Sequence, residues 1–269
     1  MKARSLEALE VMSRRRFARR NFLTTYMGGN EQNRRVEIAA LHQQGHLILH
    51  PPNAHGSIER SYPHYFFRIY EKPHRNEHKA LQFWHQVLLD DILFSIETAC
   101  KRSALTFRDR DDVLAGRALK LPCSIEHTID GERHKSFKPI EPDAIFSIND
   151  TYFVLEADRG TEPVQRNNLN ESSYLKKILQ YRDVLKNQTY KKVWDIPNMI
   201  VLNITTKAER VQSLTDLMVK LNITSKSLTF ASYPALASSV KAPQPILSIL
   251  TDPFLRVGHD PFVIGKEVI

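Results

Sequence analysis

Residues 141–158 read EPDAIFSINDTYFVLEAD, a pattern that predicts two short strands joined by a tight turn. Apolar residues fill both halves of the stretch, and the Asn-Asp pair between them is typical of a β-hairpin turn. In such a hairpin Asp143 begins the first strand, whereas Glu156 and Asp158 end the second strand. All three carboxylates should therefore lie at the same end of the hairpin, and we expect the rest of the chain to be organised around it.

Three carboxylates at one end of a hairpin are candidates for a metal site. Carboxylates that converge repel one another unless a cation or protons lie between them. Oxygen ligands of this kind suit Mg²⁺ or Mn²⁺. Acidic residues also occur at strand ends as ordinary loop residues, and spacing alone leaves both interpretations open.

The composition is that of a globular protein. The chain has 269 residues, of which 42% are hydrophobic and 25% are charged, so it is long enough for one large domain or two small ones. No apolar run approaches the ~20 residues that span a bilayer, and the N-terminus lacks the apolar core of a signal peptide. We therefore expect a cytoplasmic protein without membrane association. Cys100 and Cys123 indicate neither a disulfide framework nor a zinc cluster.

The positive charge is concentrated at the N-terminus. Residues 1–75 hold thirteen Lys or Arg and six Asp or Glu, a net charge of +7, whereas the whole chain carries +8. A basic module of this kind is expected of a nucleic-acid-binding domain, because Lys and Arg release counterions from the phosphate backbone. A solvated basic face and an anionic partner of another kind remain as alternatives.

The same 75 residues predict three short helices followed by two strands. The third helix runs from about Asn33 to Gln44, and the strands lie near residues 46–49 and 65–70. This order predicts a winged helix-turn-helix domain over residues 1–75. Its third helix would enter the major groove, and the loop from Pro51 to Pro63 would be the wing along the DNA backbone.

Four arginines are the predicted DNA-binding residues of this domain. Arg34 and Arg35 on the third helix are the leading candidates for contacts to bases or phosphates, and Arg15 and Arg19 precede them in a basic segment. The alternative is a small α/β interaction module that does not contact DNA.

Residues 76–241 predict a second domain with an α/β core and a mixed sheet. A long helix from Glu77 to Lys101 opens it, and we expect the acidic Asp90, Asp91 and Glu97 on its solvated face rather than at the carboxylate end of the hairpin. Proline-rich residues 242–269 are expected to run extended along the surface. The fold class is therefore α+β. The further predicted elements are a strand over 119–129, a helix over 171–186, a buried strand over 199–205, a helix over 207–221 and a strand over 227–231.

Two resemblances follow from these motifs. The order helix, three strands, helix, strand, helix, strand, with Asp143 on one strand and Glu156-x-Asp158 on the next, resembles the core of PD-(D/E)XK nucleases. The run from Glu156 to Thr161, with Lys177 and Tyr181 in the following helix, is similar to the replication-relaxation family of plasmid and phage proteins. The resemblance covers most of residues 5–231.

The resemblance implies a function. It implies a DNA-binding protein of a plasmid, phage or other mobile element, with double-stranded DNA and a relaxase or replication protein as partners. Its nuclease-like core would cleave a phosphodiester bond, by nicking, with Mg²⁺ or Mn²⁺. Carried over position by position, Asp143 and Glu156 would be metal ligands, and Asp158 and Lys177 would complete the catalytic set.

One position departs from the nuclease pattern. Asp158 stands where the motif has a lysine that orients the attacking water, so the cation would have to come from Arg159 or Lys177. Three hypotheses therefore remain open: a metal-dependent endonuclease, a non-catalytic accessory protein that binds DNA or a relaxase-like partner, and a winged-helix transcription regulator that dimerises through its C-terminal domain. A nicking monomer and a double-strand-cutting homodimer are both consistent with the sequence.

Overall fold

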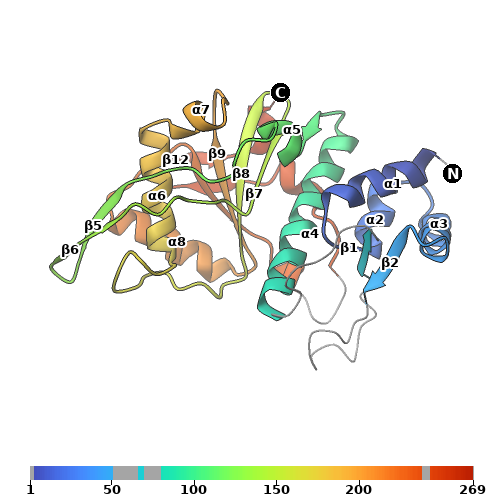
Figure 1. Cartoon of the computed structure of the whole chain (residues 1–269), viewed down its shortest axis with the longest axis horizontal. Coiled ribbons are helices and arrows are strands. Elements are labelled where there is room, and N and C mark those ends of the chain that lie inside the picture. Colours follow the sequence, from blue (N-terminus) through green and yellow to red (C-terminus); the bar gives the residue numbers. More distant parts are fainter. Residues whose placement is uncertain (1–2, 51–65, 70–79, 238–242, 269) are drawn as a thin grey trace. The chain divides into compact units, whose positions relative to one another are not determined.

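A computed structural model describes residues 3–50, 66–69, 80–237 and 243–268 (Figure 1). The chain divides into two compact units, which are described separately. Unit 1 comprises Met1–Ser103 and Ala235–Ile249, and unit 2 comprises Ala104–Pro234 and Leu250–Ile269. The structure is α+β with a mixed seven-stranded sheet, which confirms the predicted class. No helix in the described ranges combines the length and the apolar character needed to cross a membrane.

Unit 1 is a helical cluster with a small sheet. Its three described strands are arranged in the order β1-β3-β2, and both neighbouring pairs are antiparallel. The first three helices contact one another and bury Met12, Phe22 and Ile38. The elements are α1 (Ala3–Arg14), β1 (Ala18–Arg19), α2 (Arg20–Met27), α3 (Glu31–Gln43), β2 (Leu47–His50), β3 (Phe66–Ile69) and α4 (Ala80–Arg102).

Helix α3 lies where the sequence predicted the third helix. It begins two residues earlier than expected, because the side chain of Asn30 caps it by accepting a hydrogen bond from the backbone N–H of Asn33 at 3.2 Å. Gly45 follows with φ +78°, a left-handed conformation that favours glycine after a helix. The segment from Pro51 to Pro63, predicted to be the wing, lies outside the described residues.

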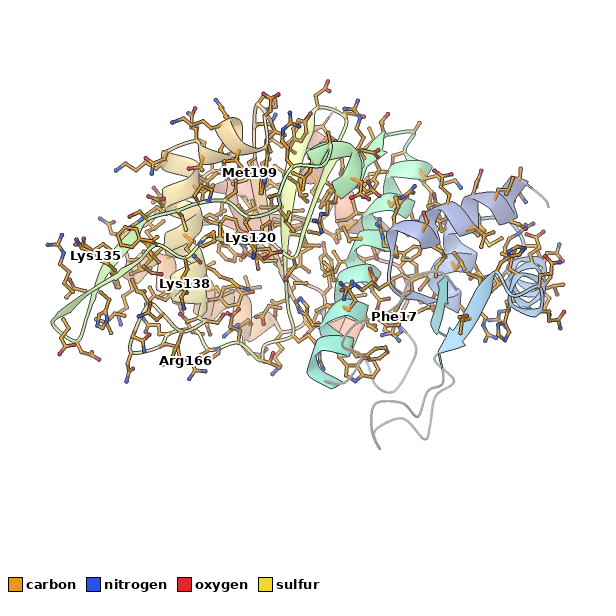
Figure 2. All side chains as sticks on the ribbon, viewed as in Figure 1. Phe17, Lys120, Lys135, Lys138, Arg166 and Met199 are labelled. Atoms are coloured by element: carbon orange, nitrogen blue, oxygen red, sulfur yellow. The ribbon has the colours of Figure 1, made fainter. Side chains whose placement is uncertain are left out.

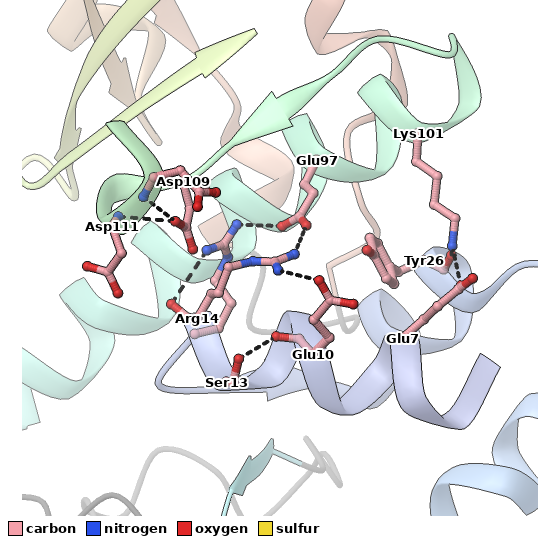
Figure 3. A network of polar contacts seen from close by, with 11 residues as sticks. Glu7, Glu10, Ser13, Arg14, Tyr26, Glu97, Lys101, Asp109 and Asp111 are labelled. Atoms are coloured by element: carbon pink, nitrogen blue, oxygen red, sulfur yellow. Dashed lines mark hydrogen bonds and ion pairs between the residues drawn. The ribbon is translucent and has the colours of Figure 1, made fainter. Parts of the chain in front are cut away.

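Helix α4 differs from expectation in two ways. It is grouped with unit 1, whereas the sequence analysis placed it in the second domain. Asp90, Asp91 and Glu97, expected on a solvated face, are all buried. The prediction was wrong because cationic partners sit far away in the sequence: Arg15 Nη2 lies 2.6 Å from Glu97 and Arg19 Nε lies 2.8 Å from Asp91. Figure 3 shows Glu97 pairing with Arg14, which also reaches Glu10 of its own helix.

Unit 2 is built on the seven-stranded sheet. Its strand order is β12-β11-β10-β9-β8-β7-β4, in which β8, β9 and β10 are parallel and the other pairs are antiparallel. Helix α6 connects β8 to β9, and α8 connects β9 to β10. The elements are β4 (Phe107–Arg108), α5 (Arg110–Leu114), β5 (Ile125–Ile129), β6 (Glu132–Ser136), β7 (Ala144–Ile148), β8 (Thr151–Asp158), α6 (Tyr174–Lys186), α7 (Thr189–Val193), β9 (Ile200–Thr205), α8 (Ala208–Lys220), β10 (Leu228–Ser232), β11 (Phe254–Arg256), β12 (His259–Phe262) and α9 (Ile264–Glu267).

The predicted hairpin is confirmed as β7 and β8. The two strands pair in antiparallel register from Ala144 opposite Leu155 to Ile148 opposite Thr151. Asn149 in the turn has φ +51°, a conformation that asparagine tolerates better than most residues. Strand β9 is almost wholly buried between β8 and β10, as its continuous apolar run predicted.

The C-terminal residues do not run extended over the surface as predicted. Strands β11 and β12 continue the sheet beyond β10, and they bury Phe254 and Phe262. The two phenylalanine rings contact each other edge to face at 6.3 Å between centroids. Because the two strands are only three and four residues long, they show too little alternation to be recognised from the sequence.

The buried ion pairs of unit 1 lead to a stability prediction. The Asp91→Ala substitution leaves the guanidinium of Arg19 buried without its carboxylate, and we expect it to lower the free energy of unfolding by roughly 3 kcal/mol. Urea unfolding at about pH 8, where carboxylates are mostly ionised, measures the change.

The matched control is Glu31→Ala, which breaks an exposed ion pair with Arg35 one helical turn away. Exposed pairs of this type contribute at most about 1 kcal/mol, so Glu31→Ala should change the midpoint little. Equal effects of the two substitutions would contradict a stabilising role for the buried pair.

Candidate active site at the end of strand β8

Two of the predicted carboxylates lie side by side. Asp143 directly precedes β7, and the pairing of Ala144 with Leu155 places it next to Glu156 on β8. The backbone N–H of Ala157 donates a hydrogen bond to Asp143 Oδ2 at 2.8 Å, which holds that side chain against the end of β8. The structure therefore brings Asp143 and Glu156 together, as the hairpin predicted.

Glu156 is the buried centre of the site, with only 1% of its surface exposed. Lys177 Nζ donates to Glu156 Oε2 at 2.9 Å, and the hydroxyl of Tyr181 donates to Oε1. Lys177 and Tyr181 are four residues apart on α6, so both side chains lie on one face of the helix. Each oxygen of Glu156 is therefore bound by a donor from the helix that follows its own strand.

Lys177 is shared between two carboxylates. Its Nζ lies 3.0 Å from Glu162 Oε2 in addition to its contact with Glu156, and it sits 5.3 Å from the centroid of the Tyr174 ring. Glu162 follows β8 in a loop, and the sequence analysis did not single it out. An acidic residue in a polar loop gives no sign of this role, since only the fold brings it to Lys177.

Asp158 is held by a different cation. Arg210 Nε lies 2.7 Å from Asp158 Oδ2, and the backbone N–H of Gly160 donates to Oδ1 at 2.8 Å. Arg210 also donates to the backbone carbonyl of Glu162 and lies over the Tyr174 ring at 4.7 Å. Asp158 therefore stabilises the turn after β8 and does not join Asp143 and Glu156. Arg210 was missed as well, although its place in the first turn of the helix after β9 is what a parallel β8–β9 pair brings near the end of β8.

The environment shifts the acidities of the central groups. The pKa of Glu156 is raised to about 7, chiefly because burial disfavours the charged carboxylate; Lys177 lowers this pKa and Asp143 raises it. Burial lowers the pKa of Lys177, but Glu156, Tyr174 and Glu162 outweigh burial and keep its pKa above the usual range. Burial also raises the pKa of Tyr181, which stays a neutral donor to Glu156.

The donor set fits a hard divalent cation held by two residues. Within the described ranges, no three acidic, His or Cys side chains are grouped so that they could enclose a metal ion. Mg²⁺ needs no such cage, because it is commonly held by one or two carboxylates together with water and substrate phosphates. Asp143 and Glu156 offer that pair of carboxylates, so they fit the predicted Mg²⁺ or Mn²⁺.

The arginines predicted to bind DNA are mostly engaged inside unit 1. Arg15, Arg19 and Arg34 are buried, and each is paired with a carboxylate, in the case of Arg34 with Glu37. Arg35 remains half-exposed at the surface of α3. Their basic sequence pattern thus reflects internal ion pairing at three positions, and only Arg35 offers its guanidinium to solvent.

The raised pKa of Glu156 predicts a pH dependence of stability. Because its folded pKa of about 7 exceeds the ordinary value of 4.5, the native state binds this proton more tightly than the unfolded chain. The free energy of unfolding should therefore fall as pH rises from about 4.5 to about 7. Above pH 7, ionisation of Glu156 should lower it by roughly 3 kcal/mol relative to its value below pH 4.5. Glu156→Gln should remove this part of the slope, as measured by urea unfolding across the pH range.

Glu209→Gln serves as the control because Glu209 is an exposed acid in the first turn of α8. It should retain the wild-type slope. A Glu156→Gln protein with the same pH profile as Glu209→Gln would refute the raised pKa.

No family model, curated protein or solved structure matches this chain.

Proposed function

We propose that this chain is a DNA-binding protein of a mobile element whose unit 2 nicks DNA with the help of Mg²⁺. The observation that carries the proposal is the convergence of Asp143, Glu156 and Lys177 at one end of the hairpin. Two carboxylates and a lysine are groups that metal-dependent phosphodiester cleavage can use, and here they come from the start of β7, the end of β8 and the following helix.

The connectivity of unit 2 supports the proposal. Strands β4, β7 and β8 are neighbours in an antiparallel arrangement, α6 follows β8, and β9 then lies parallel to β8. This is the order of strands and helix expected of the PD-(D/E)XK core that the sequence resembles. Asp143 and Glu156 occupy the positions on the second and third strands at which that resemblance implies metal ligands.

The charges around the site also support a cation there. The carboxylates of Asp143 and Glu156 are close enough that the charge of Asp143 raises the pKa of Glu156. A divalent cation bound by both carboxylates would reduce this repulsion.

Each residue of the site has a role in this proposal. A bound Mg²⁺ supplies Lewis-acid polarisation of the phosphate and lowers the pKa of water. Asp143 and Glu156 would hold it, with Asp143 oriented by the Ala157 N–H. Tyr181 fixes the orientation of Glu156. Lys177 would neutralise charge that develops on the phosphate oxygens, since it supplies the cation that Asp158 lacks.

Unit 1 supplies the proposed DNA-recognition domain. The order α1, β1, α2, α3, β2, β3 and the antiparallel sheet β1-β3-β2 support a winged helix-turn-helix. On α3 the side chains of Gln32, Asn33 and Arg35 are exposed. Amide and guanidinium groups on one exposed helix surface are suited to hydrogen bonds with bases and phosphates.

A second candidate function is DNA binding without cleavage. Asp158 favours it, because the position at which a nuclease of this type has a free lysine is occupied by a carboxylate that Arg210 and Gly160 hold in place. Under this alternative the same fold serves as a scaffold for mobilisation or replication proteins.

Plasmid cleavage distinguishes the two candidates. We expect the purified protein to convert supercoiled plasmid to open circles with Mg²⁺ or Mn²⁺ but not with EDTA. Asp143→Asn and Glu156→Gln should each lower the rate at least about a hundredfold, because each removes a charged ligand of the metal. Gel electrophoresis of the plasmid measures the rate, and the appearance of linear DNA would indicate cutting of both strands.

Glu209→Gln is the control and should cleave like the wild type. Filter binding of the same plasmid shows whether the two site variants still bind DNA. Wild-type protein that retards the plasmid and leaves it intact with either metal would reject the nuclease and establish the second candidate.

A further inference from the structure

Strands β5 and β6 form a ribbon apart from the main sheet. Within the described residues they pair only with each other, in register from Ile125 opposite Ser136 to Ile129 opposite Glu132. Their base is joined by the bridge between Leu121 and Ile140. In Figure 1 the tip of the ribbon extends past α6 and away from the seven-stranded sheet. The sequence predicted a strand over 119–129, of which only the second half belongs to this ribbon.

The two faces of the ribbon differ in chemistry. Ile125 and Ser136 are buried, and Ile129 packs against the core of unit 2, so the face that carries them points inward. Residues alternate between faces along a strand, which places Arg133 and Lys135 on the opposite, outer face. Phe137 directly follows β6, and the same alternation places it on the outer face as well. Figure 2 shows Lys135 projecting from the ribbon.

The outer face combines available cations with an exposed aromatic ring. The side chains of Arg133 and Lys135 are 69% and 55% exposed, and both pair with the single carboxylate of Glu126. Exposed ion pairs are weak, so these cations can exchange Glu126 for another anion at little cost. Phe137 is 73% exposed, the largest exposed fraction of any large apolar side chain in the described residues.

A second group of cations lies where the ribbon meets α6. Lys138 follows Phe137 and is exposed, and its Nζ donates a hydrogen bond to the backbone carbonyl of Asn170 at 3.0 Å. Lys176 on α6 is buried. Its pKa is lowered by burial and by the positive charge of Lys138.

We infer that the outer face of the β5–β6 ribbon, with Arg133, Lys135 and Phe137, is a contact surface for duplex DNA. Arg133 and Lys135 bind backbone phosphates, and Phe137 packs on the sugars and base edges of the groove. This inference rests on the proposed DNA-binding function and adds a contact surface on unit 2.

The dimensions and charges favour a duplex over other partners. A two-stranded ribbon fits the major groove of B-DNA, and cations spaced two residues apart along a strand can follow its phosphates. Exposed Lys138 extends the basic surface to α6, because its backbone carbonyl accepts a hydrogen bond from Gln180 of that helix at 2.8 Å. A duplex on the ribbon would thus be bound next to the element that supplies the proposed catalytic cation.

The triple substitution Arg133→Ala, Lys135→Ala and Phe137→Ala in the full chain tests the surface. We expect it to weaken binding of a fluorescent duplex of about two helical turns roughly tenfold in anisotropy titrations. The slope of log K against log salt should fall by about two, one for each lost phosphate contact. Glu126→Gln should strengthen binding, because it removes the carboxylate that competes with phosphate.

The matched control is Lys191→Ala, Lys192→Ala and Val219→Ala, which removes two exposed lysines and an exposed apolar residue from α7 and α8. It should bind like the wild type, and thermal midpoints should show that all variants fold. Equal affinities of the ribbon and control variants would overturn the inference, as would tighter binding of single-stranded DNA or RNA than of the duplex.

Metal-dependent plasmid cleavage by the same proteins separates this inference from the proposed function. A wild-type protein that cleaves or binds plasmid, together with a ribbon variant of unchanged affinity, would reject the ribbon surface alone. A wild-type protein that binds no nucleic acid would reject both.

Discussion

The buried ion pair between Glu156 and Lys177 is the interaction on which the candidate site depends. A carboxylate at the end of a central strand, with 1% of its surface exposed, is stable only if its charge is compensated or removed. Lys177 compensates the charge of Glu156, and Tyr181 donates a hydrogen bond to the same carboxylate. Burial also raises the pKa of Glu156 to about 7, so its carboxylate can be neutralised by a proton near neutral pH. Placing both donors on one face of α6 in turn fixes how that helix packs over β8. The same arrangement holds Asp143 beside Glu156, with its carboxylate oriented by the backbone N–H of Ala157.

Unit 1 also buries carboxylates, and it compensates their charge with other residues. Its long helix α4 carries Asp90, Asp91 and Glu97 into the interior. The backbone N–H of Phe17 binds Asp90, and the guanidinium groups of Arg19 and Arg15 bind Asp91 and Glu97. Burial raises the pKa of Asp90 to about 7 and that of Asp91 to about 6. The basic segment before α2 therefore serves to dock α4. Arg35 on α3, in contrast, keeps its guanidinium at the surface, where it pairs with Glu31.

Features that depend on residues close together in the sequence could be predicted. Contacts between residues far apart in the sequence could not. The β7–β8 hairpin and its carboxylates followed from alternation and an Asn-Asp turn, and β9 followed from a continuous apolar run. Lys177 and Tyr181 could be placed together because four residues separate them on one helix. Arg210 and Glu162 could not, since only the crossover from β8 to β9 brings them to Asp158 and Lys177. Arg15 and Arg19 were predicted to contact DNA because a run of arginines looks the same whether its partner is phosphate or a buried carboxylate 82 or 72 residues away.

Asp158 and Glu156 both lie at the end of β8, but they are paired with different cations. If Asp158 pointed at Asp143 and Glu156, three carboxylates would repel one another. Arg210 instead draws Asp158 away, and Gly160 completes the turn that keeps it there. Lys177 approaches Glu156 from α6. The pairs Asp158–Arg210 and Glu156–Lys177 therefore form one charge arrangement, in which each carboxylate at the end of β8 has a cationic partner from a different helix.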